Sequence, residues 1–93
     1  MLTVHKYKIP KPKKAVAFSI DLPKGAKILT VQSQNNKPQI WILLNSARDL
    51  TETRNFFVMV TGGLIMEEKE LNYVGTFQMD EGNFVGHVFE TKS

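Results

Sequence analysis

Apolar and polar residues alternate along most of this chain, with the two-residue period of strands that have one buried face. Residues 16–21 and 54–61 show the alternation clearly, whereas residues 39–44, QIWILL, are apolar after the first position. Such an apolar run predicts a central strand that is covered on both faces. The predicted strands are residues 3–9, 16–21, 26–34, 39–45, 54–61, 72–78 and 83–90.

Turn-forming residues separate the early strands. Pro23-Lys24-Gly25 combines a residue of fixed φ with one that accepts positive φ, and Asn35-Asn36 tolerates left-handed backbone. The three strands that these turns join are expected to follow one another as a meander around the buried central strand.

The second half contains similar breaks. Gly62-Gly63 ends the strand 54–61, and residues 80–83 predict a hairpin turn. Residues 64–71, LIMEEKEL, are the one candidate helix, although they would also serve as a loop folded over an open end of the sheet. Gly75 and Gly86 lie in neighbouring predicted strands, where a missing side chain allows a bulge, a bend or a close approach.

These features predict an all-β protein, a small antiparallel sandwich or barrel-like meander of about six to seven strands with at most one short helix. The 93 residues allow a single domain, 1–93, with one modest core.

Trp41 lies in the most apolar predicted strand, so we expect it to be largely buried between two layers of sheet. Its indole N–H would then bond to a carbonyl or side chain of the loop 45–53. The alternative is an exposed indole that anchors an interface.

Composition restricts the setting. The chain has no cysteine, which excludes disulfides and thiol chemistry, and no apolar run of about 18 residues that would span a membrane. The first ten residues lack the apolar region of a signal peptide. We therefore expect a cytoplasmic protein without a membrane partner.

Charge is divided unevenly between the two halves. Residues 1–37 carry eight lysines and one aspartate, a formal charge of +7, whereas residues 38–93 carry four basic and eight acidic residues, a charge of −4. The split indicates either a basic face for an anionic partner or mutual attraction of the two halves, within or between protomers.

No catalytic or metal-binding motif is present. His5 and His87 are the only histidines, and neither has the spacing of a metal site or a carboxylate arrangement that indicates acid–base catalysis. A strand histidine among apolar neighbours is typical of hydrogen-bonded structure. The sequence therefore predicts no catalytic residue, no metal and no cofactor.

One group of residues is a candidate anion site. Arg54 comes just before an apolar strand and can present a planar fork to a phosphate or carboxylate, or pair with Glu52 instead. We expect a homo-oligomer whose polar loops meet at a subunit seam. The predicted anion contacts are Arg54, Lys24 and Lys27, with His5 or Tyr7 adding hydrogen bonds.

Several segments resemble, in order, a family of short phage and prophage proteins of unknown function. The resemblance covers nearly the whole chain. It rests on residues 4–10 (VHKYKIP), 22–29 (LPKGAKIL), 31–32, Trp41, 52–54 (ETR), 61–62, 73–77 (YVGTF) and 84–90 (FVGHVFE). It implies a mobile-element setting, in which small accessory proteins bind a host protein or sequester a nucleotide signal of host defence.

Two functional hypotheses follow. The first is a non-enzymatic accessory protein that binds a host protein or an anionic, nucleotide-like small molecule. The alternative is a nucleic-acid-binding accessory protein that uses the lysine-rich first third of the chain.

Overall fold

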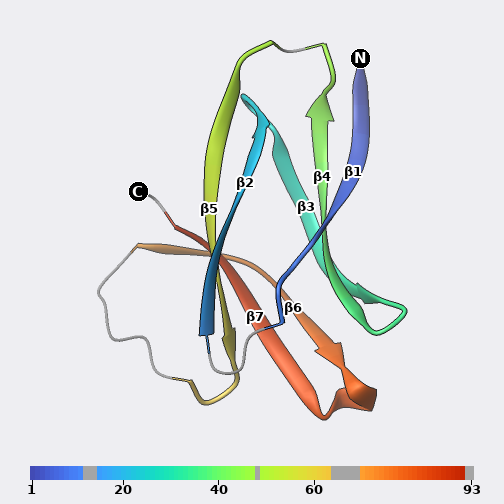
Figure 1. The fold of residues 1–93 in the computed structure, drawn as a ribbon, viewed down its shortest axis with the longest axis vertical. Coiled ribbons are helices and arrows are strands. Elements are labelled where there is room, and N and C mark those ends of the chain that lie inside the picture. The colour runs from blue at the N-terminus through green and yellow to red at the C-terminus, as the bar shows by residue number, and fades with distance from the viewer. Residues whose placement is uncertain (12–14, 48, 64–69, 92–93) are drawn as a thin grey trace.

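The computed structural model describes residues 1–11, 15–47, 49–63 and 70–91. They form two antiparallel sheets, one of three strands in the order β1-β4-β3 and one of four in the order β2-β5-β7-β6 (Figure 1). We call these sheet A and sheet B. The elements are β1 (Leu2–Lys8), β2 (Ala15–Pro23), β3 (Lys27–Gln34), β4 (Lys37–Asn45), β5 (Thr51–Val60), β6 (Leu71–Met79), the short turn η1 (Asp80–Gly82) and β7 (Phe84–Thr91).

The all-β prediction is confirmed, and the seven strands lie where the alternation placed them. The predicted meander is wrong at its first step, because β2 pairs with β5 in sheet B whereas β3 pairs with β4 in sheet A. The two turns also differ in their backbone. Asn35 and Asn36 both have positive φ, 52° and 61°, which suits a tight hairpin. In the Pro23–Ala26 turn only Gly25 has positive φ, 87°, and the chain passes to the other layer.

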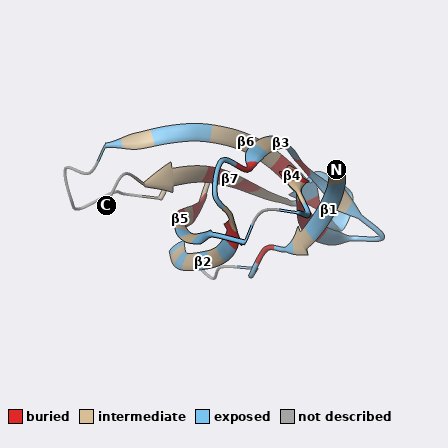
Figure 2. Cartoon of the chain, turned by 90° about the horizontal axis from the view of Figure 1, so that it is seen from above, coloured by how far each residue is buried: buried red, intermediate tan, exposed pale blue. Residues whose placement is uncertain are grey.

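Buried residues from both sheets form one core, and Figure 2 shows in red where the buried positions lie along the chain. Alternate residues of β4 supply its centre, since Ile40 and Ile42 are fully buried and Leu44 nearly so. Sheet B contributes Phe56, Val58, Phe77 and Val88 from its facing side. This is the arrangement expected when two half-buried sheets pack face to face.

The two sheets meet closely along β3 and β6. A Cβ on Gly75 would lie 3.0 Å from the Cβ of Val31, and the hydroxyl of Ser33 donates a hydrogen bond to the carbonyl of Gln78. The register of β6 against β7 shifts between Tyr73 and Gly75, so the predicted bulge and close approach are both confirmed. Gly86 leaves room for the ring of Phe77.

Hydrogen bonds join the turn between β3 and β4 to the turn between β6 and β7. Asp80 accepts hydrogen bonds from the Asn36 amide (2.9 Å) and the Lys11 ammonium (3.2 Å), and its own N–H donates to the Asn36 side chain (2.7 Å). These bonds lower the pKa of Asp80, the Asn36 bond having the largest effect and Lys11 the next. The turn between β6 and β7 was predicted and is confirmed.

Two further expectations concern helices. Most of the candidate helix, residues 64–69, lies outside the described residues, and Leu71 begins β6. In the part of the chain that the structure describes, no helix is long and apolar enough to cross a membrane.

Replacing Gly86 by alanine tests the packing of Phe77. A glycine-to-alanine change in extended backbone ordinarily stabilises by roughly 0.4–1 kcal/mol through the unfolded chain. Here the new Cβ would lie 2.4 Å from Cζ of Phe77, whose side chain is 2% exposed. We expect Gly86→Ala to lower the free energy of unfolding by about 1–3 kcal/mol in urea titrations. In a Phe77→Leu background the loss should shrink, and equal losses in both backgrounds would contradict this account.

Replacing Asp80 by asparagine tests the link between the hairpins. A carboxylate whose pKa is lowered by folding stabilises the protein above its ordinary pKa, and this contribution is lost as the pH falls through the folded value. Asparagine tolerates the φ of 52° at this position. We expect Asp80→Asn to melt below the wild type at neutral pH, with the difference disappearing below about pH 4. Glu81→Gln controls for net charge, and a difference that does not change with pH would refute the prediction.

Candidate functional site

Sheet A has a side that faces away from sheet B, and no other described strand packs on it. Because Ile40, Ile42 and Leu44 point into the core, Trp41 and Leu43 point outward. The antiparallel register brings outward residues of β1 and β3 beside them. We call this surface the lysine-bearing face. It comprises Leu2, Val4, Lys6 and Lys8 of β1, Lys37, Gln39, Trp41, Leu43 and Asn45 of β4, and Lys27, Leu29, Thr30, Gln32 and Gln34 of β3.

The aliphatic side chains of this face are unusually exposed. Leu2 is 66% exposed, Val4 49%, and Leu29, at the bulge between Ile28 and Thr30, 45%. With half-buried Trp41 and Leu43 they form an apolar surface over all three strands. Apolar residues that gather on one face, with charges around them, are typical of an interaction surface.

The charged residues on the lysine-bearing face have one sign. Lys6, Lys8, Lys27 and Lys37 are exposed, and none of the described residues at these outward positions is acidic. The ammonium of Lys6 donates a hydrogen bond to Gln34, so its side chain crosses β4. Gln39 lies on β4 between these two strands and is 6% exposed although it points outward.

The expected burial of Trp41 between two sheets is wrong. Trp41 lies on the lysine-bearing face, half-buried, with Lys6 and Thr30 directly opposite it on the two neighbouring strands. The apolar run 39–44 predicted two covered faces, but only the face of Ile40 and Ile42 meets another sheet. The structure therefore agrees with the alternative in one respect, because the indole lies on the outer face and is only partly buried.

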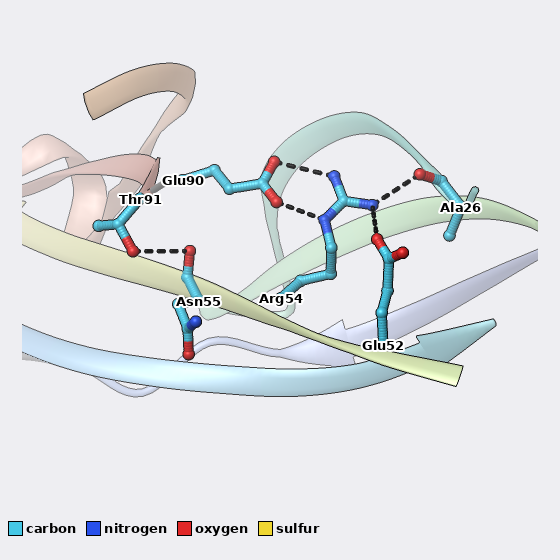
Figure 3. A network of polar contacts seen from close by, with 6 residues as sticks. All are labelled: Ala26, Glu52, Arg54, Asn55, Glu90 and Thr91. Atoms are coloured by element: carbon cyan, nitrogen blue, oxygen red, sulfur yellow. Dashed lines mark hydrogen bonds and ion pairs between the residues drawn. The ribbon is translucent and has the colours of Figure 1, made fainter. Parts of the chain in front are cut away.

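Arg54 is held by several acceptors on the inner side of sheet B (Figure 3). Its Nε and Nη2 donate to the two carboxylate oxygens of Glu90, the second bond measuring 2.9 Å, and its Nη1 donates to the Ala26 carbonyl at 2.8 Å. Glu52 lies 3.7 Å from Nη1. The bond to Glu90 raises the pKa of Arg54, partial burial opposes this effect, and the charges of Glu90 and Glu52 add to it.

This arrangement compensates the charge of Arg54 within the protein. The sequence pointed to Glu52 as a possible partner, but it gave no sign of Glu90, which β5–β7 pairing brings close from 36 residues away. An anion at Arg54 would have to replace one of these carboxylates. Binding of an anion at Arg54 stays a prediction, and a bound anion would compete with the Glu90 carboxylate for the guanidinium.

The other predicted anion contacts are divided between two places. Lys24 lies in the turn after β2, next to Ala26 and therefore near Arg54, whereas Lys27 points outward on the lysine-bearing face. His5 and Tyr7 lie on β1 and point to the opposite side of sheet A from Lys27. The structure does not bring the five residues together around one point.

A shallow depression of about 310 Å³ lies beside the edge of sheet B. It is lined by Ala17, Phe18, Ser19, Asn55, Phe56, Phe57 and Thr91. None of these side chains is charged, so the depression does not have the chemistry of an anion site.

A chain of hydroxyl groups around His87 was not apparent in the sequence. Nε2 of His87 lies 2.7 Å from the Thr61 hydroxyl and Nδ1 lies 3.1 Å from that of Thr76, which in turn contacts Tyr73 at 2.5 Å. Each hydroxyl can donate or accept, so the ring is satisfied in either tautomer. Both ring nitrogens of His87 contact threonine hydroxyls, whereas in a catalytic triad a carboxylate would lie beside one of them. The arrangement therefore supports the expected structural role of His87. Among the described residues, no group of three or more ligating side chains could hold a metal ion.

Fold and surface together define a small two-layer antiparallel sandwich with one lysine-bearing sheet face. A family model described as a domain of unknown function (DUF7352) matches residues 1–93, and the chain belongs to this family. The expected membership of a family of unknown function is thereby confirmed. Searches among curated proteins and among solved structures each found no match.

Replacing the two carboxylates near Arg54 separates their contributions. Glu90 makes a two-bond contact and is 20% exposed, whereas Glu52 lies 3.7 Å away and is 37% exposed. We expect Glu90→Gln to lower the free energy of unfolding by about 1–3 kcal/mol, because it leaves a partly buried charge with weaker acceptors. Glu52→Gln should cost less than about 1 kcal/mol. Equal losses in urea unfolding would show that the Glu90 contact is not the dominant one.

Proposed function

We propose that this protein is a non-enzymatic accessory protein of the phage type, which acts by binding a host protein through the lysine-bearing face. The observation that carries the proposal is the combination of exposed Leu2, Val4 and Leu29 with Trp41 inside a set of lysines. Tryptophan and aliphatic residues provide desolvated contact area, and charges of one sign speed the encounter with a complementary surface. The sequence resemblance supports the mobile-element setting.

The partner's surface follows from this chemistry. It presents apolar side chains that cover Trp41 and Leu43, with carboxylates around them that meet Lys6, Lys8 and Lys27. The exposed aliphatic residues support a protein over a small anion, because a nucleotide-like ligand would leave most of this apolar area in water. The compensated charge of Arg54 also counts against the small-anion version.

Affinity capture from host-type cells, with a tag at the C-terminus, tests this proposal. Trp41→Ser and Lys6→Gln/Lys27→Gln should each lose the partner that the wild type retains, since they remove the apolar anchor and the charges. Lys11→Gln/Lys24→Gln removes the same charge from exposed positions outside this face, beside Asp80 and in the turn after β2, and should retain it. A partner bound equally by all variants would refute the assignment of this face.

The retained partner, once purified, should bind the wild type in calorimetry with an affinity that falls about tenfold or more in Trp41→Ser. The alternatives give different results. Binding of single-stranded nucleic acid with a steep dependence on salt would favour the nucleic-acid hypothesis, in which Trp41 stacks on bases beside Lys6. A nucleotide that raises thermal stability, by roughly 2.7 kcal/mol at 100 times its dissociation constant, would favour the small-molecule version.

A further inference from the structure

The sandwich is closed along one side and open along the other. β3 and β6 meet at the closed side, where Val31 packs on Gly75. β1 and β2 form the remaining edges of sheets A and B. Four of the hydrophobic residues that are only partly buried against the core lie on these two edge strands, namely Tyr7, Val16, Phe18 and Ile20. The described residues therefore cover the core incompletely at the side of β1 and β2, which we call the open side.

The two open edges differ in how they are protected from pairing. β1 carries exposed Lys6 and Lys8, and lysines on an edge strand discourage the addition of another strand. β2 is nine residues long and has a single charged side chain, Asp21, which accepts a hydrogen bond from Thr53 at 2.6 Å. Its backbone pairs with β5 on one side, and no strand of the part of the chain that the structure describes pairs with its other side. A long apolar edge without such protection is a site for strand addition.

We propose that β2 pairs with β2 of a second copy of this chain, antiparallel, about a two-fold axis at Phe18. Val16 then lies opposite Ile20 of the second copy, and Phe18 lies opposite its own equivalent. On the other face Ala17 lies opposite Ser19, and Ala15 opposite Asp21. In each facing pair at least one side chain is uncharged, so no like charges lie opposite each other.

This register covers the partly buried apolar residues of β2 that a single protomer leaves at its edge. Phe18 already stacks on Phe56 with ring centroids 5.1 Å apart, and the second Phe18 extends the stack along the core side of the joined sheet. Val16, Phe18 and Ile20 all gain a neighbouring strand on their open side. A shift of the axis to Ser19 would instead use Leu22, which is already fully buried and has nothing to gain. The proposal is independent of the proposed function, because it requires no partner other than the chain itself.

The oligomeric state of the protein in solution tests whether β2 pairs with a second copy. Light scattering after size exclusion at micromolar concentration should give twice the chain mass for the wild type and the chain mass for Ala17→Lys/Ser19→Lys, in which lysines of the two copies lie directly opposite each other. Ala17 and Ser19 are exposed and point away from the core, so the protomer accommodates both lysines. Thr30→Lys/Gln32→Lys adds the same charge on sheet A and should remain dimeric. A monomeric wild type, or a dimeric Ala17→Lys/Ser19→Lys, would overturn the proposal.

Disulfide trapping tests the register, since the chain has no cysteine of its own. Directly opposed residues of antiparallel strands have Cα atoms about 4.5–5.5 Å apart, within the range of a disulfide. Ala17→Cys/Ser19→Cys should therefore give a covalent dimer that reductant separates. Ser19→Cys alone and Thr30→Cys/Gln32→Cys should stay unlinked. Efficient linking of Ser19→Cys alone, or none in the double variant, would refute this register.

Discussion

The close contact between β3 and β6 determines how the two sheets sit on each other. Val31 occupies the space that a side chain at Gly75 would need, and the bulge before Gly75 adapts β6 to this neighbour. Closure at β3 and β6 leaves β1 and β2 as edges with half-buried apolar residues between them. The core, the open side and the proposed pairing of β2 all follow from this one contact.

Alternation within β4 links the core to the candidate site. The same six residues supply Ile40 and Ile42 to the interior and Trp41 to the outside, so the strand is apolar for two different reasons. Covering the inner face stabilises the fold. On the outer face Trp41 stays partly exposed between Lys6 and Thr30. Apolar area left in water is unfavourable for an isolated protein, but it provides contact area for one that binds a partner.

Local sequence patterns predicted the strands, the Asn35-Asn36 hairpin and the close approach at Gly75, because each depends on residues near in the chain. Pairing between distant strands was not predictable in this way. Nothing near Pro23 shows that β2 leaves the meander for β5, and nothing near Arg54 points to Glu90. The contact of His87 with Thr61 likewise arises from β5 and β7 lying side by side. Periodicity alone also could not decide whether Trp41 or Ile42 faces the core, because both sets are apolar.

The proposed dimer has a consequence for the proposed function. Antiparallel pairing of β2 about a two-fold axis perpendicular to the sheet would join the two copies of sheet B into one continuous sheet. Each sheet A packs on the same side of its own sheet B, so both would lie on one side of the joined sheet. Their lysine-bearing faces, which point away from sheet B, would then face in one general direction. Two such faces on one rigid body bind a partner with repeated or dimeric surfaces more tightly than either face alone. Pairing at the β2 edge and docking at the lysine-bearing face use different strands, so the two interactions do not compete.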